Sequence, residues 1–81
     1  MNIGEWIRQE CTKHGITVSE LARNIGCSQA LIIHWRKRNS TPKTYYFLLV
    51  CQEIAQLRGE SVYTVITEGA SILGIHLSDD T

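Results

Sequence analysis

The fold is decided by TVSELARNIGCSQALIIHWRK, residues 17–37. Ala22 is small where two crossing helices would approach each other most closely, and Gly26 can adopt the positive φ that ends a helix and turns the chain. Ile32 and Trp35 are three residues apart, so on a second helix both can point back at the first. The apolar residues that would meet them are Leu21, Ala22 and Ile25. This spacing predicts a helix-turn-helix, a motif whose second helix lies in the DNA major groove.

Capping signals place both helices of this motif. Thr17, followed three residues later by Glu20, is a capping box, which predicts that the first helix begins at Val18. Ser28 can cap the second helix, which then begins at Gln29. The last turn of that helix holds Arg36, Lys37 and Arg38. Positive charge at this end suits the helix macrodipole.

The flanking segments show the periodicity of two further helices. Asn2 and Glu5 form a capping pair, after which residues on one face recur at helical spacing until Gly15. These residues are Ile3, Trp6, Ile7, Cys11 and His14. Pro42 suits the first position of a later helix, which ends before Gly59. The apolar face of that helix is formed by Phe47, Leu48, Cys51, Ile54, Ala55 and Leu57.

The segment from residue 61 to 78 has two interpretations. Ser61 can cap a helix that stops at Gly74, and this helix is favoured. One face of it would carry Val62, Val65, Ile66, Gly69, Ile72 and Leu73. The run SVYTVIT is rich in strand formers, so a β-hairpin turning near Glu68 is the alternative.

The chain accordingly divides into a helix-turn-helix core, residues 1–60, a C-terminal segment, residues 61–78, and a tail, residues 79–81, that is expected to fray. The C-terminal segment either completes the core or pairs with a second copy, because it carries more apolar surface than the first four helices are expected to cover. The residues expected at such a dimer interface are Val62, Val65, Ile66, Ile72 and Leu73, continued by Ile75 and Leu77.

Composition limits the classes of protein to consider. With 81 residues the chain has room for one domain with one core. No apolar run is as long as a membrane span and the N-terminus has no signal-peptide pattern, so a cytoplasmic protein is expected. The sequence contains no phosphate-binding glycine loop, no paired carboxylates and no nucleophile–base spacing, so an enzyme is not expected. The three cysteines and three histidines lack zinc-site spacing, so no metal or other cofactor is expected, and Cys11 and Cys51 should be buried.

The formal net charge of zero conceals an uneven distribution. Residues 23–46 carry a charge of +5, from Arg23, Arg36, Lys37, Arg38 and Lys43. Residues 47–81 carry −4, from Arg58 against Glu53, Glu60, Glu68, Asp79 and Asp80. A basic stripe on and just after the second helix of the motif is typical of a surface that contacts DNA phosphates.

The stretch LARNIGCSQALIIHW, the polar loop with Pro42 and the apolar run FLLVCQEIA together resemble the Xre/Cro/CI-type helix-turn-helix proteins of bacteria and phages. The resemblance covers about residues 3–58 and extends to about residue 70. It implies an all-α fold, a compact bundle of four or five helices. It also implies a repressor or activator that binds a palindromic operator as a homodimer, without enzymatic activity.

The resemblance assigns roles to individual positions. Gln29 matches the position that commonly meets adenine, where a glutamine can bond both N6 and N7. The other matches to base-reading positions are Ala30, Ile33 and His34. The residues expected near DNA phosphates are Thr17, Ser19, Arg36, Lys37, Arg38, Asn39, Lys43 and Thr44.

The chain departs from the family pattern in two places. Leu31, Ile32 and Ile33 make the reading helix unusually apolar, so base contacts would be few and DNA shape or a protein contact would contribute more. The acidic residue and glycine that often follow the tryptophan are replaced by basic residues. The leading hypothesis is a small phage- or prophage-type repressor. The alternatives are a DNA-binding antitoxin with a toxin partner, and a protein-interaction module that has lost DNA binding. For a repressor of this kind, an antirepressor is a further candidate binding partner.

Overall fold

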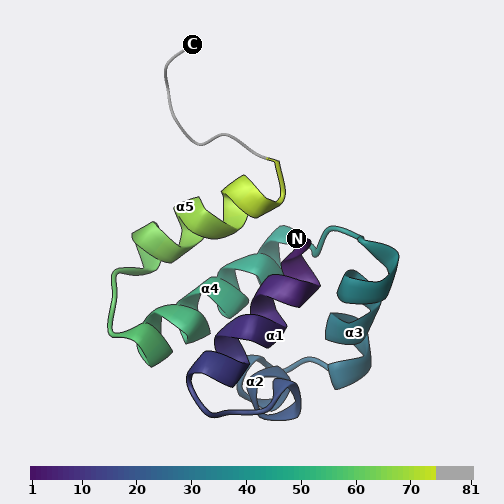
Figure 1. The fold of residues 1–81 in the computed structure, drawn as a ribbon, viewed down its shortest axis with the longest axis horizontal. Helices are drawn as coiled ribbons and strands as arrows, with labels where there is room; N and C mark the ends of the chain where they lie inside the picture. Colours follow the sequence, from purple (N-terminus) through teal and green to yellow (C-terminus); the bar gives the residue numbers. More distant parts are fainter. Residues whose placement is uncertain (75–81) are drawn as a thin grey trace.

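A computed structural model of the chain describes residues 1–74. These residues form five α-helices and no strand (Figure 1). The helices are α1 (Ile3–Lys13), α2 (Val18–Ile25), α3 (Gln29–Arg38), α4 (Thr44–Arg58) and α5 (Val62–Ile72). The predicted all-α bundle is confirmed, and of the two interpretations of the C-terminal segment the helix is correct and the hairpin is wrong. The expectations for Ile75, Leu77 and residues 79–81 lie outside the described residues.

Side-chain caps begin the helices as the sequence predicts, with one exception. The Asn2 side chain accepts a hydrogen bond from the backbone N–H of Glu5 at 2.8 Å, and Ser61 accepts one from the N–H of Tyr63 at 3.1 Å. Pro42 is not in the first turn of α4, and that prediction is wrong. Lys43 has extended backbone angles, φ −62° and ψ 149°, so the helix begins only after it.

One apolar core lies between the helices. Ile7, Leu21, Ile54 and Val65 are completely buried in it, and Cys11 and Cys51 are buried as predicted. Leu48 was expected on the core face of α4 but is 45% exposed. The buried face of α4 is centred on Phe47, Val50, Cys51 and Ile54, and Leu48 lies beyond its edge.

Helix α5 closes this core and buries some of the residues that were expected at a dimer interface. Val65 is completely buried within the single chain, so it cannot also lie at a subunit interface. Ile66, Ile72 and Leu73 are half-buried against the same core. Gly69 is buried against Phe47, since a Cβ added there would lie 2.9 Å from a ring carbon of that residue. Among the predicted interface residues that lie within 1–74, only Val62 is exposed, at 41%.

A buried ion network fixes α5 to the rest of the bundle, and the sequence analysis did not detect it. The Arg58 guanidinium at the end of α4 donates to Glu10 of α1 at 2.8 Å and to Glu68 of α5 at 2.7 Å. The Trp6 indole N–H also donates to Glu68, at 2.7 Å. Hydrogen bonds from Arg58 lower the pKa of both carboxyl groups, and the pKa of Arg58 is raised in return. Glu10 is 1% exposed, so this carboxylate depends for compensation of its charge mainly on Arg58, and also on Lys13 at 3.3 Å.

Within residues 1–74 no helix is both long enough and apolar enough to cross a membrane.

Candidate nucleic-acid interface

The helix-turn-helix forms between α2 and α3 with the predicted caps. Thr17 accepts from the N–H of Glu20 at 3.0 Å and Glu20 accepts from the N–H of Thr17 at 3.1 Å, which completes the capping box. Gly26 ends α2 with φ 79°, in the left-handed region that glycine adopts without strain. Ser28 then accepts from the N–H of Leu31 at 3.2 Å and starts α3. The turn is therefore specified locally at each step.

The inner side of α3 holds it against the bundle. Ile32 and Trp35 are 2% and 3% exposed and belong to the same buried cluster as Leu21 and Ala22 of α2. The ring of Trp35 also packs against the ring of Tyr46 on α4, with the two ring centroids 6.3 Å apart. These contacts confirm the predicted core of the motif.

The outer side of α3 contains most of the residues expected to read bases. Gln29, Ala30 and His34 are exposed. Ile33 is half-buried, because it also lines a cleft against α1. No ligand contact tests the assigned roles, so the base-reading assignment stays a prediction that exposure permits.

Lys37 lies on this outer side as well, which its assignment to phosphate contact did not anticipate. It is exposed and follows Ile33 by four residues and His34 by three. Residues at these separations share one face of a helix. The spacing from His34 to Lys37 was the available signal, and the position of Lys37 within a run of three basic residues obscured it.

Helix α3 ends without a glycine. The helix continues through Arg38 and ends at Asn39, the one non-glycine residue with positive φ among those described, at 51°. Asparagine tolerates this left-handed conformation better than most residues. The three basic residues are therefore in helix, and the loop to α4 begins after them.

The residues expected near phosphates occupy two places, the start of α2 and the stretch from the end of α3 to the start of α4. The exposed members of this set are Thr17, Lys37, Arg38, Asn39, Lys43 and Thr44, while Ser19 and Arg36 are half-buried. The Thr17 hydroxyl is already engaged, since it also donates to Glu20 at 3.2 Å. Arg38 and Lys43 are thus free to contact a ligand, whereas Thr17 acts first as a cap.

Helix α1 approaches α3 very closely, and sequence reasoning missed the residue that permits it. A Cβ added to Gly4 would lie 2.4 Å from the backbone nitrogen of Arg36. The Asn2 side chain donates to the backbone carbonyl of Arg36 at 2.6 Å. A glycine inside a predicted helix was the available signal, because such a glycine often marks close packing.

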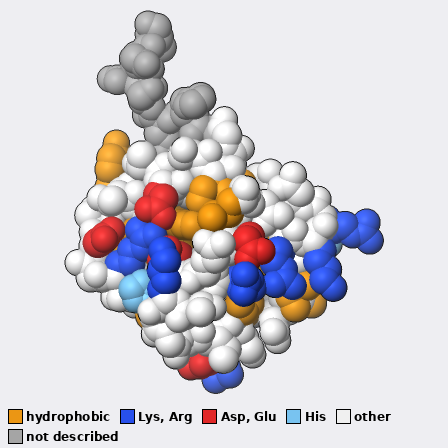
Figure 2. All heavy atoms as spheres, viewed as in Figure 1, with side chains coloured by type: hydrophobic (Ala, Val, Ile, Leu, Met, Phe, Trp, Pro, Cys, Tyr) orange, Lys and Arg blue, Asp and Glu red, His pale blue; other side chains and the backbone are white. Residues whose placement is uncertain are grey.

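The basic residues on this side of the molecule have no acidic partners in the described part of the chain. None of Arg23, Arg36, Lys37, Arg38 and Lys43 forms an ion pair there. Figure 2 shows mostly blue side chains on the side where Figure 1 places α3, whereas blue and red are interleaved on the opposite side. On this face of the described residues, the basic side chains on the α3 side are thus set apart from the mixed charges around Arg58.

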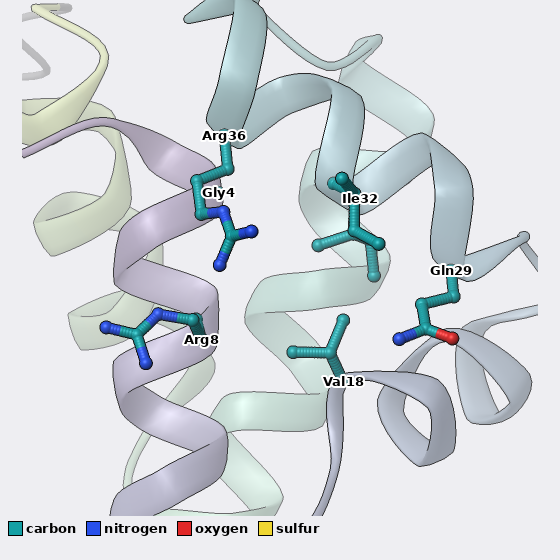
Figure 3. Close-up of a pocket in the computed structure, with 7 residues that line it drawn as sticks. Gly4, Arg8, Val18, Gln29, Ile32 and Arg36 are labelled. Carbon is teal, nitrogen blue, oxygen red and sulfur yellow. The ribbon is translucent and has the colours of Figure 1, made fainter.

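A cleft of about 130 Å³ opens between α1, the start of α2 and α3 (Figure 3). Its lining is Gly4, Arg8, Val18, Gln29, Ile32, Ile33 and Arg36. Two of the lining residues are arginines and none is acidic, and the Arg8 head group turns away from Val18 and Gln29 (Figure 3).

Cys11 and Cys51 are buried thiols. All three cysteines are free thiols, and burial raises the pKa of Cys11 to about 11 and that of Cys51 to about 12. Cys27, in the turn, is half-buried and its pKa is also raised by burial. No group of three potential metal ligands occurs among residues 1–74.

No family model, curated protein or solved structure matches this chain.

Proposed function

We propose that this protein is a sequence-specific DNA-binding transcriptional regulator that inserts α3 into the major groove. The observation that carries the proposal is an exposed face on α3 whose neighbouring basic residues have no acidic partner among residues 1–74. Such a helix, held from behind by Ile32 and Trp35, can contact base edges without losing its place in the fold. Repression follows if the bound site overlaps a promoter.

The exposed side chains suit different base edges. Gln29 can donate to and accept from adenine at once, and Lys37 can donate to the O6 and N7 acceptors of guanine. His34 can donate to a guanine or to a phosphate. Ala30 and Ile33 offer apolar contact to thymine methyl groups. With only a few polar readers, the sequence dependence of DNA shape would add to the discrimination.

Arg38, Asn39, Lys43 and Thr44 would fix the helix in the groove by contacting phosphates on one side of it. Their contacts carry no sequence information but supply most of the salt-dependent affinity. Selection from a random pool of DNA duplexes tests the whole proposal. An enriched palindrome is the expected result. No enrichment, by a protein that remains folded, would instead favour a protein-interaction module on the same scaffold.

The proposal includes a symmetric dimer, since one reading helix contacts too few base pairs to single out a genomic site. Exposed apolar side chains offer two surfaces for it, one at the start of α4 and one at the start of α5, near the other end of α4. They are Tyr45, Leu48, Val62 and Tyr63. In such a dimer the two copies of α3 would bind half-sites whose centres are about 34 Å, or about 10 base pairs, apart.

Sedimentation with operator DNA tests the dimer. Leu48→Glu, which places a charge on the exposed apolar surface of α4, should shift binding from two copies per operator toward one. Thr12→Glu adds the same charge to an exposed residue of α1, away from this surface, and serves as the control. If the wild-type protein and Leu48→Glu bind with the same stoichiometry and affinity, this surface is not the interface.

A further inference from the structure

The cleft between α1 and α3 has features of an anion site that the helix-turn-helix itself does not require. It joins three helices, because Gly4 and Arg8 belong to α1, Val18 begins α2, and the remaining lining residues come from α3. Two of its side chains are cationic and none is anionic. A volume of about 130 Å³ admits a phosphate group together with water.

Arg36 is positioned for this site by its own backbone. Gly4 lets α1 approach the main chain of Arg36, and Asn2 holds its carbonyl group at 2.6 Å. The guanidinium extends from α3 toward α1 (Figure 3). It forms no ion pair with any residue in the described part of the chain. Its charge is therefore available to a ligand.

Arg8 contributes the second charge from α1. Its side chain is 47% exposed and is held by Glu5, one turn earlier, through Nε to a carboxylate oxygen at 2.6 Å. That pair lies at the surface, where such ion pairs contribute little and exchange readily with solvent. A guanidinium has five donors in a planar fork, so Arg8 can bind a phosphate oxygen while retaining part of its contact with Glu5.

We propose that this cleft binds one phosphate of the nucleic-acid backbone between Arg8 and Arg36, so that α1 is part of the DNA interface. The inference rests on the proposed function and adds a contact that the helix-turn-helix resemblance does not assign to Arg8. Gln29 lines the opposite side of the same cleft (Figure 3), so the bound phosphate and the first base-reading residue would share one hollow of the surface. A phosphate held by two crossing helices fixes the depth and angle of α3 in the groove, which a contact from one flexible side chain does not.

The test is the slope of log affinity against log salt concentration on duplex DNA. The double variant Arg8→Ala/Arg36→Ala should flatten the slope by about 0.9, the value for one phosphate, although two charges are removed. Arg8→Ala alone should weaken binding at every salt concentration, and Arg8→Lys should keep wild-type affinity and slope because the charge remains. Wild-type affinity in Arg8→Ala would leave Arg36 as a lone contact and overturn the shared site. Lys13→Ala, at the other end of α1 and outside the cleft, removes one charge from the same helix and should leave the slope unchanged.

Three further outcomes would overturn the shared site while leaving DNA binding intact. The double variant could keep the wild-type slope, it could flatten the slope by about 1.8 as two separate phosphates require, or Lys13→Ala could flatten the slope as much as the double variant does.

If the wild-type chain binds no duplex at any salt concentration, the proposed function fails, and the cleft is tested separately. The NMR resonances of the Arg8 and Arg36 Nε–H groups are then followed during titration with deoxyguanosine monophosphate and with inorganic phosphate. Saturable shifts of both resonances would identify a free phosphate compound as the ligand in place of the DNA backbone. Unchanged resonances would overturn the site.

Discussion

The two ends of the bundle use positive charge in opposite ways. At the α5 end, Arg58 has a side chain only 14% exposed and is neutralised by Glu10 and Glu68. At the α3 end, Lys37 and Arg38 are exposed and have no acidic partner in the part of the chain that the structure describes. A net charge of zero therefore does not argue against DNA binding here. The acidic residues that balance the count act partly inside the protein, where they fix a helix.

The largest loss of stability is expected from replacing Arg58. Arg58→Ala should lower the free energy of unfolding by about 3 to 5 kcal/mol, because the buried Glu10 carboxylate loses its compensating charge. Urea unfolding of the variant measures the loss. Arg38→Ala removes the same type of side chain from the exposed end and should change stability by less than about 0.5 kcal/mol. Equal losses in the two variants would mean that the two ends do not differ as described.

Acid should act on the α5 end first. The pKa values of Glu10 and Glu68 are lowered in the folded protein, so their contribution to stability is complete above the unfolded-state pKa, about 4.5, and is lost as pH falls through the folded-state values. Hydrogen exchange in α5 should therefore accelerate before that in α3 as pH is lowered, after correction for the intrinsic exchange rates. Glu68→Gln should weaken this pH dependence. Simultaneous loss of protection in both helices would contradict the prediction.

Gly4 allows α1 to pack closely against α3 and so helps to set the position of α3. Gly4→Ala should cost about 1 to 3 kcal/mol of stability, because the new methyl group meets backbone atoms of Arg36 that cannot turn aside. Since α3 must shift, affinity for the preferred operator should also fall in the variant while it is still folded. Circular dichroism and binding titrations at the same temperature separate the two effects. Retention of both stability and affinity would show that α1 does not position α3.

A base contact on the exposed end should be specific where a phosphate contact is not. Gln29→Ala should weaken binding to the preferred site by about 1 to 3 kcal/mol and binding to random DNA much less, with specificity relaxed at one base pair per half-site. Competition titrations with both DNAs measure the difference. Equal losses on both would remove Gln29 from the base-reading set.

The smallest effect is expected for a single unpaired charge. Lys43→Ala should flatten the plot of log affinity against log salt by about 0.9 on every sequence alike, without changing which site is preferred. Lys13→Ala removes one lysine charge outside the proposed interface, although that lysine is paired with Glu10 at 3.3 Å, and is the control. A Lys43→Ala slope equal to that of the control would exclude Lys43 from phosphate contact.

Local signals in the sequence predicted the local structure. The capping box at Thr17, the left-handed Gly26 and the cap at Ser28 each act within a few residues, and each is confirmed. The inward direction of Ile32 and Trp35 follows from helical spacing and is also confirmed.

The long-range contacts were not predictable in the same way. The bond from Arg58 to Glu10 joins residues 48 apart, and neither its existence nor its partner follows from periodicity. One signal was present, since Glu10 falls three residues after Ile7 and so lies on the apolar stripe of α1. A charged residue at such a position indicates a buried partner, but the sequence does not identify which arginine supplies it.

The outer face of α3 has an evolutionary consequence. Ala30, His34 and Lys37 are exposed, and replacing such residues generally changes folding stability by less than about 0.5 kcal/mol. Ile32 and Trp35, which hold the helix, lie on its other side. In the proposed DNA-binding regulator, new operator preferences would therefore arise by single substitutions on this face without compensating changes in the core. The same scaffold would for that reason be a starting point for engineering regulators that recognise different operators.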